Sequence, residues 1–365
     1  MRPIRVLQLG MTSNYGGIEA YVMNLYRQLD HQQFQFDFVD WSTDRSIAYA
    51  DEIVQLGGQI IKVVNRRTHP LKNWQMIRQL VTSDKYQVIY NNLNSRSYLT
   101  GVLAGLKCAK ARVIAHAHND GIERDHKLSQ LLDQINRHRI NRRGIIKVAC
   151  SQAAGQWMFN GQDFRVVNNA IETSHYAYRQ DVRQRLRRQL GLEGKLVIGS
   201  VARLSSQKNP LFLVELLATV VKTTPRAVLL IIGDGQMREE LLNYARQLNV
   251  ADKVKLMGMQ NHTADFMQAM DVLAAPSIFE GFGISVLEAQ CAGLPCVVSP
   301  AFHQDVMQTP LVEKRSLADL SGWVEAVLTS QRSMPRHSYA LDLVEQGFDI
   351  KMLSEQVVPL MTGEA

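Results

Sequence analysis

Short runs of β-branched and other apolar residues alternate with longer segments of helical period along most of the chain. In the first half, the runs expected as strands are 4–9, 34–39, 59–64, 87–91, 112–117, 145–150 and 165–167. Helical periodicity separates several of them, at 17–29, 70–82, 96–107 and 125–140. Strands that alternate with helices in this way are typical of a parallel sheet covered by helices on both faces.

The same pattern restarts after a basic amphipathic segment, residues 181–190, which leads into the glycine-containing turn 191–194. The second set of expected strands is 196–201, 227–232, 253–256, 271–274 and 295–298. This predicts the α/β class, with two Rossmann-like, doubly wound parallel-sheet domains facing across a cleft. The N-terminal domain is expected to span 1–175 and the C-terminal domain 176–345.

Length and composition agree with two globular domains. The chain has 365 residues, which is longer than single hydrophobic cores usually grow. No run approaches the roughly 18 apolar residues of a membrane-spanning helix, so we expect a soluble or peripheral protein. The four cysteines have no Cys-x-x-Cys spacing, and they are Cys108, Cys150, Cys291 and Cys296. We therefore expect reduced thiols and a cytoplasmic location.

The net charge of +7 is unevenly distributed. Residues 1–175 hold 22 Lys and Arg against 14 Asp and Glu, an excess of +8, whereas the remainder has 19 against 20. A basic half suits an anionic membrane surface or a phosphorylated acceptor, but it also suits an ordinary solvated surface. Both interpretations stay open, and we expect no nucleic-acid partner.

A glycine pair follows the first expected strand and opens the next helix directly. Gly16 and Gly17 let the backbone approach an anion at a helix N-terminus, although a tight strand-to-helix turn would need the same residues. The spacing is not the Gly-x-Gly-x-x-Gly of dinucleotide sites, which counts against a dehydrogenase.

Two cations follow the first strand of the second domain. Arg203 lies just past the strand, and Lys208 precedes the Asn-Pro that starts the next helix. Together they could neutralise a diphosphate without a metal. The strand 227–232 ends in Gly233-Asp234-Gly235, which is either a second loop close to a ligand or an ordinary turn.

The most informative stretch is 276–295. Gly281 and Gly283 flank Phe282 at a strand-to-helix turn, which frees N–H groups before Ile284 at the helix start. Glu280 precedes the turn, and Glu288 lies further along the helix. Carboxylates beside anion-binding N–H groups suit sugar and ribose hydroxyls, whose O–H donors need strong acceptors.

Two histidines end the strand 112–117. His116 and His118 alternate along the strand, so both rings could line the cleft, with Asn119 beside them. A metal site is a weaker interpretation because no Asp-x-Asp or carboxylate-rich partner lies nearby. A buried structural histidine is the other alternative.

These motifs, taken in order, resemble glycosyltransferase family 4, which has the two-domain GT-B fold. The similar segments are Gly16-Gly17-Ile18-Glu19-Ala20, Ala202-Arg203-Leu204 with Lys208, Gly233-Asp234-Gly235, Glu280 with Glu288, and Asn168-Asn169-Ala170-Ile171-Glu172. The resemblance spans residues 1 to about 300. It implies a nucleotide-sugar donor as substrate, no cofactor and no metal.

The resemblance also assigns roles. Arg203 and Lys208 would bind the donor diphosphate, Glu288 the ribose and Glu280 the transferred sugar. Met257 would border the base, and Gly17 would close on the phosphates. His118 matches the family's histidine near the transferred sugar, whereas His116 and Asn119 are expected on the acceptor side. His118, Glu280, Arg203 and Lys208 are the expected catalytic set.

The chain departs from many members of the family at 299–307. This variant resembles bacterial exopolysaccharide and capsule-assembly transferases, which implies a glycan or polyprenyl-diphosphate-linked acceptor at the inner membrane face. The final helix, at 349–362 within the segment 346–365, is expected to pack back on the first domain, as in similar folds.

The expected reaction is sugar transfer with retention. The acceptor hydroxyl would attack on the face that the donor leaves, assisted by the departing phosphate, while cations and helix N-termini stabilise the leaving charge. Two alternatives remain. One is a nucleotide-sugar epimerase or sugar phosphorylase of the same fold, and the other is a non-catalytic sugar-nucleotide-binding assembly protein.

Overall fold

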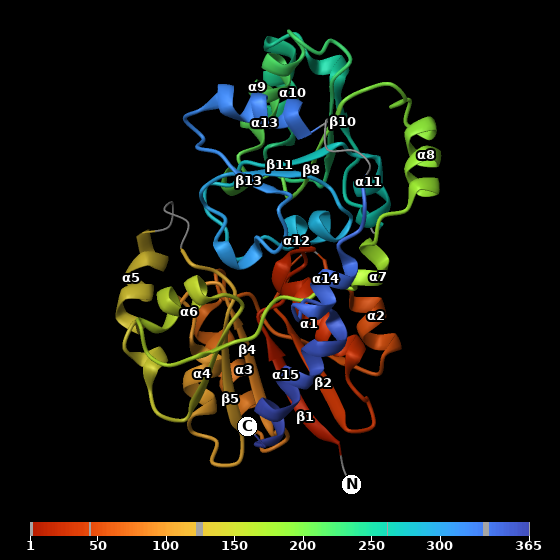
Figure 1. Cartoon of the computed structure of the whole chain (residues 1–365). Helices are drawn as coiled ribbons and strands as arrows, with labels where there is room; N and C mark the ends of the chain where they lie inside the picture. The colour runs from red at the N-terminus through yellow and green to blue at the C-terminus, as the bar shows by residue number, and fades with distance from the viewer. Residues whose placement is uncertain (1–2, 44, 122–126, 261, 331–335, 365) are drawn as a thin grey trace. The chain divides into compact units, whose positions relative to one another are not determined.

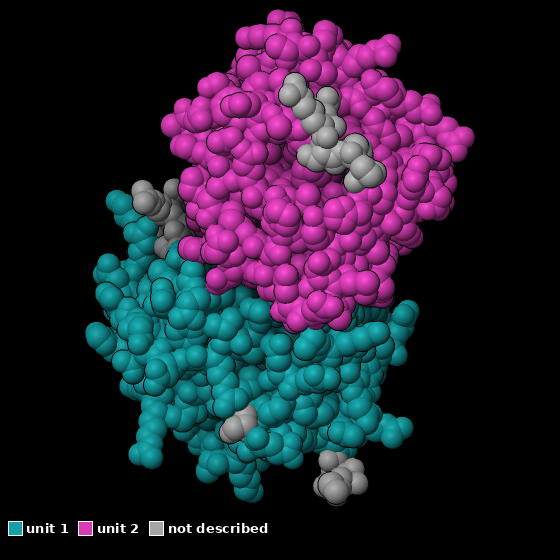
Figure 2. All heavy atoms as spheres, in the orientation of Figure 1, with its two compact units in different colours: residues 1–170, 349–365 teal, residues 171–348 magenta. Residues whose placement is uncertain are grey.

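In the computed structural model, the described residues are 3–43, 45–121, 127–260, 262–330 and 336–364. They form two compact units, which Figure 2 colours separately. Unit 1 contains residues 1–170 and 349–365, and unit 2 contains residues 171–348. The boundaries therefore fall at 170/171 and 348/349, where 175/176 and 345/346 were expected. Each unit is described by itself.

Unit 1 is built on a parallel sheet of seven strands in the order β3-β2-β1-β4-β5-β6-β7 (Figure 1). The strands are β1 (Ile4–Leu9), β2 (Phe34–Asp40), β3 (Gln59–Lys62), β4 (Val88–Leu93), β5 (Arg112–Ala117), β6 (Ile145–Ala149) and β7 (Arg165–Val166). All seven predicted strands are confirmed. The apolar pattern found the central strands β1, β4 and β5 because a strand buried on both faces reads as a largely apolar run.

The helices of unit 1 include two that periodicity did not predict. The predicted helices are α1 (Gly17–Gln28), α3 (Pro70–Val81), α4 (Thr100–Gly105) and α5 (Lys127–Asn136), and the additional ones are α2 (Ala50–Gln55) and α6 (Gln152–Phe159). Residues 125 and 126 of the predicted helix 125–140 lie outside the described residues. With six and eight residues, α2 and α6 make about two turns each, which is too short for a clear period.

The final helix, α15 (Ile350–Thr362), belongs to unit 1. Its buried residues Leu353, Val357 and Leu360 join the same core cluster as α1, and Figure 1 draws the two helices together. Arg112 Nε donates to the Leu360 carbonyl at 2.9 Å. The C-terminal segment therefore completes the core of the N-terminal unit.

Unit 2 repeats the topology with six parallel strands in the order β10-β9-β8-β11-β12-β13. The strands are β8 (Val197–Val201), β9 (Val228–Ile232), β10 (Val254–Leu256), β11 (Val272–Ala275), β12 (Cys296–Val298) and β13 (Val312–Lys314). Its helices are α7 (Thr173–Tyr176), α8 (Gln180–Gln189), α9 (Pro210–Val220), α10 (Arg238–Gln247), α11 (Thr263–Ala269), α12 (Ile284–Cys291), α13 (Leu320–Ser330) and α14 (Ala340–Glu345). β13 was not predicted because its sequence, Val-Glu-Lys, contains one apolar residue and so forms no apolar run.

The strand order reverses direction between β1 and β4 in unit 1, and between β8 and β11 in unit 2. Ligands of doubly wound sheets bind outside the carboxyl ends of the strands at such points. The loops that follow β8 and β11 carry Arg203 and Glu280, and the loop after β5 carries His118. Unit 2 thus places predicted site residues at its own switch point, whereas His118 of unit 1 follows β5, one strand beyond the switch.

Candidate active site

A direct ion pair joins the two predicted loops of unit 2. The Lys208 Nζ atom contacts Glu280 Oε2, and both side chains are largely buried. Ser277 Oγ donates to the same carboxylate oxygen at 3.3 Å. Because an ammonium group has three N–H donors, Lys208 can hold Glu280 and still donate to a phosphate.

Backbone contacts fix the two loops against each other. The Ile278 N–H donates to the Gln207 carbonyl at 2.8 Å. The Gln207 side-chain amide donates to the Phe279 carbonyl at 3.1 Å. Lys208 ends the short turn Ser206–Lys208, and Pro210 then begins α9. The chain after β8 is thereby held beside the chain after β11.

Arg203 supplies an uncommitted positive charge at this edge of the sheet. Its side chain is exposed, and its guanidinium has no hydrogen bond or ion pair to any residue that the structure describes. Arg203 follows β8 by two residues, and Lys208 lies on the same loop. An anion bound here would therefore contact Arg203, which is free, and Lys208, which Glu280 already orients.

The glycines of the 233–235 loop are explained by the protein's own backbone. Gly233 has a φ of +136°, and a Cβ there would lie 2.0 Å from the Ala202 carbonyl oxygen. A Cβ on Gly235 would lie 2.3 Å from the Leu204 oxygen. These glycines let the loop pack against the chain on either side of Arg203. Met257 lies at the adjacent end of β10, where its N–H donates to Ile231 at 2.9 Å.

The turn before α12 also depends on a close contact. Gly283 is the N-cap of α12 with a φ of +93°, and a Cβ there would lie 2.4 Å from the Phe302 ring. Phe302 is buried and comes from the segment that departs from the family pattern. Phe282 is also buried, with its ring stacked on Phe348 at 6.2 Å. The turn can therefore offer backbone N–H groups but not the Phe282 ring.

Glu288 lies on α12 but has its own partner. The Tyr176 hydroxyl of α7 hydrogen bonds to it, and that hydroxyl also lies 3.2 Å from Thr263 Oγ1. Burial raises the pKa of Glu288 from 4.5 to about 7, and the Tyr176 hydrogen bond opposes the shift. The structure thus links Glu288 to Tyr176 and shows no contact between it and Lys208. Nothing in the sequence marked Tyr176.

In unit 1, a polar network at the ends of β1, β4 and β5 orients His118. The Asn92 amide nitrogen donates to the Leu9 carbonyl and to Gln8 Oε1, both at 3.0 Å. Its oxygen therefore faces His118 Nε2, also at 3.0 Å, and must accept a hydrogen bond from the Nε2–H group. His118 is consequently held as the Nε2–H tautomer, and burial lowers its pKa to about 3.

This tautomer leaves Nδ1 of His118 as a hydrogen-bond acceptor. No described residue hydrogen bonds to that atom, which is itself buried although the His118 side chain as a whole is partly exposed. A neutral imidazole with a free lone pair can accept a hydrogen bond from a hydroxyl group, but it carries no positive charge. The sequence did not single out Asn92 or Gln8, because nothing local marks a residue whose partner is 26 positions away.

The expectation that His116 lies on the acceptor side is corrected. His116 is fully buried, and its Nδ1 lies 2.9 Å from the Tyr90 hydroxyl, which in turn lies 3.0 Å from the Tyr21 hydroxyl. Its ring stacks on His118 at 4.0 Å. The pKa of His116 is lowered, first by burial and then by His118. His116 therefore supports the His118 ring from inside the core.

Gly16 caps α1, and Glu19 holds the loop before it. The Glu19 carboxylate accepts from the Gly16 N–H at 3.2 Å, and from the N–H and hydroxyl of Thr12 at 2.8 Å each. A Cβ on Gly16 would lie 2.8 Å from that carboxylate. Burial raises the pKa of Glu19, and these hydrogen bonds oppose the shift. Gly17 is the first residue of the helix.

Asn119 accepts a hydrogen bond from the Asp120 N–H at 3.2 Å.

The described residues also bear on metal binding. Within them, no group of three or more His, Cys, Asp or Glu side chains is arranged to hold a metal ion.

Comparison with known proteins covers most of the chain. Residues 15–175 match the family Glycosyltransferase Family 4, and residues 182–309 match Glycosyl transferases group 1. A putative glycosyltransferase of Bacillus subtilis, EpsF, is 28% identical over 94% of this chain and 93% of its own length. An Escherichia coli enzyme named UDP-Gal:alpha-D-GlcNAc-diphosphoundecaprenol alpha-1,3-galactosyltransferase is 24% identical over 81% of this chain and 79% of its own.

Solved structures confirm the fold. Anabaena HepE, determined in complex with UDP and glucose, superposes with a TM-score of 0.80 at 20% identity, over 98% of this chain and 99% of its own. WaaG, a glycosyltransferase involved in lipopolysaccharide biosynthesis, gives a TM-score of 0.72 at 16% identity, over 99% of this chain and 100% of its own. With two matching domain families and the paired sheets of the GT-B fold, the chain belongs to glycosyltransferase family 4 and is a hexosyltransferase-type enzyme.

Proposed function

We propose that this enzyme transfers a sugar, with retention, from a UDP-sugar to a glycan or lipid-linked sugar acceptor in exopolysaccharide or capsule biosynthesis. It would need no metal and no cofactor. The observation that carries the proposal is the Lys208–Glu280 ion pair beside the free Arg203 guanidinium, at the switch point of the unit 2 sheet.

Departure of a nucleoside diphosphate leaves negative charge on the phosphate oxygens. Arg203 would bind it through a planar fork of N–H donors, and Lys208 would add a point charge held in place by Glu280. The N–H groups at the start of α12, exposed by the Gly283 turn, would supply further donors. Such preorganised donors can replace a divalent cation in stabilising a leaving group.

Retention follows in this proposal from attack on the face that the diphosphate leaves. A double displacement would need a free carboxylate as nucleophile. Glu280 is neutralised by Lys208, and Glu288 is held by Tyr176 with a raised pKa, so neither is prepared for that role. Glu280 would instead accept hydrogen bonds from hydroxyl groups of the transferred sugar. Glu288 would accept hydrogen bonds from the ribose hydroxyls. His118 would accept a hydrogen bond from a sugar hydroxyl through Nδ1, an atom that is buried in this structure and would have to become accessible when the donor binds.

The relatives support the donor and acceptor classes. The E. coli enzyme is named for UDP-Gal and a diphosphoundecaprenol-linked GlcNAc. A Campylobacter jejuni transferase, 32% identical over 34% of this chain, is named for a diphospho-undecaprenol-linked acceptor. HepE was determined with UDP and glucose. A lipid-linked acceptor would require this enzyme to work in peripheral contact with the inner face of the cell membrane.

A transfer assay tests the proposal. Purified protein would be incubated with labelled UDP-sugars and GDP-sugars, with and without short-chain polyprenyl-diphosphate sugars in detergent, in the presence of EDTA. We expect acceptor-dependent product whose new bond has the anomeric configuration of the donor, read by NMR. Conversion of the donor without acceptor would indicate an epimerase. No conversion of any nucleotide sugar would overturn the proposal.

A further inference from the structure

Helix α5 turns its apolar side to solvent. Leu128, Leu131, Leu132 and Ile135 are exposed by 69%, 53%, 38% and 48% of their surface. Their spacing of three, four and seven residues places them on one face of the helix. In a globular protein, such a stripe ordinarily faces the core. Here it forms an exposed apolar face, which we call the α5 face.

The polar side of α5 is the one that packs against unit 1. Asp133 is buried and accepts from Arg96 through the backbone N–H at 2.8 Å, Nε at 3.0 Å and Nη2 at 2.6 Å. Asn136 donates to the Arg96 carbonyl at 2.7 Å. Turning the apolar residues inward would expose or break this buried ion pair. The outward orientation of the α5 face is therefore fixed by the structure.

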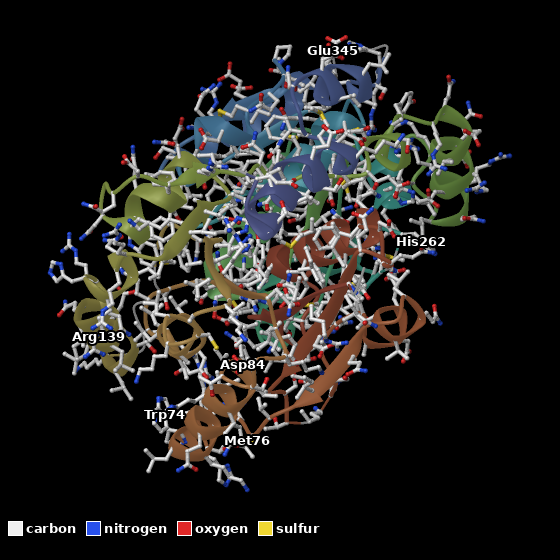
Figure 3. All side chains as sticks on the ribbon, turned by 90° about the horizontal axis from the view of Figure 1, so that it is seen from below. Trp74, Met76, Asp84, Arg139, His262 and Glu345 are labelled. Carbon is white, nitrogen blue, oxygen red and sulfur yellow. The ribbon has the colours of Figure 1, made fainter. Side chains whose placement is uncertain are left out.

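Exposed cations lie at both ends of α5 and in the segment that follows it. They are Lys127, Arg137, Arg139, Arg142 and Arg143, and Figure 3 labels Arg139 beside this helix, at the outer edge of the ribbon. Between residues 127 and 143 the only acidic residue is Asp133, whose charge Arg96 already neutralises. An apolar stripe bordered by uncompensated positive charge is typical of a helix that lies in an anionic lipid interface.

We propose that the α5 face docks on an anionic lipid bilayer. The apolar side chains would enter the boundary between headgroups and acyl chains, and the cations would lie among the headgroup phosphates. None of the helices within the described residues is long and apolar enough to cross a membrane, so docking would be peripheral. A helix of ten residues is about 15 Å long, which suits contact in the plane of the interface.

The location of α5 connects docking with the acceptor. Arg96, which anchors the helix, lies three residues after β4, and the end of β4 carries Asn92, the partner of His118. The α5 face is thus tethered to the same edge of the unit 1 sheet as the proposed sugar contact. Delivery of a lipid-linked acceptor to this edge rests on the proposed function, whereas docking itself rests on α5 alone.

Co-sedimentation with vesicles tests the docking. We expect the wild type to bind phosphatidylglycerol-containing vesicles, to bind neutral phosphatidylcholine vesicles far more weakly, and to be released by salt. The triple variant Leu128→Gln, Leu131→Gln and Ile135→Gln should bind at least about tenfold more weakly, since it removes most of the inserted apolar surface. The variant Arg139→Gln, Arg142→Gln and Arg143→Gln should lose salt-sensitive binding by a similar factor.

The matched controls replace an exposed leucine and exposed arginines that lie outside α5. Leu341→Gln alters an exposed leucine of α14 that is accessible over 78% of its surface, and Arg185→Gln with Arg188→Gln removes exposed cations of α8. Both should bind vesicles like the wild type. Circular dichroism and thermal unfolding would show that every variant is folded.

Three results would overturn the docking proposal. The first is that the α5 variants bind anionic vesicles as well as the wild type does. The second is that the control variants lose as much vesicle binding as the α5 variants. The third is that the wild type does not bind anionic vesicles. A wild-type dimer that the α5 variants convert to monomer, without vesicle binding, would show that a second copy of this chain covers the face. Transfer to a short-chain acceptor in detergent should survive the α5 variants, so a failure of docking is distinguishable from a failure of the proposed activity.

Discussion

The Asn92 side-chain oxygen accepts a hydrogen bond from His118 Nε2 at 3.0 Å, and this contact determines which nitrogen of the histidine is free. Asn92 cannot present its amide nitrogen instead, because that nitrogen already donates to Leu9 and Gln8. The carboxamide thus determines the tautomer of His118, burial keeps the ring neutral, and Nδ1 remains as the acceptor. A carboxylate in the same place would favour the imidazolium.

We therefore expect Asn92→Asp to change the pH profile of transfer. In the wild type, the pKa of His118 is about 3, so this histidine should not titrate above pH 5. In the variant, the new carboxylate raises that pKa, and activity should fall as pH decreases through the new value because protonated Nδ1 cannot accept. The measurement is kcat/KM against pH, with histidine ¹⁵N spectra reporting the tautomer.

The matched control for this prediction is Asn91→Asp. Asn91 is also a buried carboxamide of β4, but it donates to the Ile89 and Ile114 carbonyls rather than contacting His118. Its variant should destabilise the fold without introducing a new pKa into the profile. Identical profiles for the wild type and Asn92→Asp would show that His118 does not act as an acceptor.

Lys208→Gln should lower kcat by about 10²- to 10³-fold, the usual effect of removing one preorganised donor to developing charge. Glu280→Gln should also lower kcat, because it releases Lys208 as well as removing a sugar contact. Each variant should also cost about 3 kcal/mol of unfolding free energy, since both side chains are largely buried and the remaining charge would lose its partner. Exposed Lys222→Gln, in the same unit, is the control and should change neither quantity.

Donor binding should depend on the ionisation of Glu288. Its folded pKa is raised from 4.5 to about 7, so the folded protein holds a proton between these values that the unfolded chain has lost. Stability should consequently decrease as pH rises from about 4.5 to 7, whereas donor affinity should increase over that window as the acceptor carboxylate forms. Calorimetric titration of UDP-sugar at several pH values measures this dependence.

Two variants sharpen the Glu288 prediction. Glu288→Gln should remove the pH dependence of donor affinity in that window. Tyr176→Phe removes a hydrogen bond that lowers the pKa of Glu288, so its midpoint should move to higher pH. Donor affinity that stays constant from pH 5 to pH 8 in the wild type would contradict a ribose contact by the Glu288 carboxylate.

Gly283→Ala should destabilise unit 2 through two effects. The alanine must adopt a φ of +93°, which costs about 1–2 kcal/mol, and its Cβ would clash with Phe302, which adds about 1–3 kcal/mol. Gly191→Ala shares a positive φ but has no atom within 4 Å of the new Cβ, so it should show the first effect alone. If denaturant unfolding shows the same loss of unfolding free energy for Gly283→Ala and Gly191→Ala, the Phe302 ring moves aside without an energetic cost.

The fold was predictable because its central strands are buried, largely apolar runs bounded by turn signals. The elements that escaped prediction, α2, α6 and β13, are too short for a period to develop. The loops at the strand ends were predictable for the same reason, since strand order determines where they lie. Periodicity therefore located the edges of both sheets that carry the site.

Contacts within the site were less accessible from the sequence. His116 and His118 alternate on one strand, and only the packing of Tyr21 and Tyr90 shows that His116 is a core residue. Gly233 and Gly235 left a ligand loop and an ordinary turn both open, and the structure adds that they accommodate neighbouring backbone. Asn92 acquires its role from a strand neighbour distant in the chain. Such pairings depend on tertiary packing, which spacing does not encode.

The central claim is that Arg203 and Lys208 bind the diphosphate of a nucleotide sugar without a metal. Isothermal titration of UDP-sugars in EDTA tests it with the wild type, Arg203→Gln and, as control, Arg226→Gln, an exposed arginine before β9 at the opposite edge of the sheet. We predict binding by the wild type and the control, and at least about tenfold weaker binding by Arg203→Gln. Unchanged binding by Arg203→Gln, or binding only when a divalent cation is added, would contradict the claim.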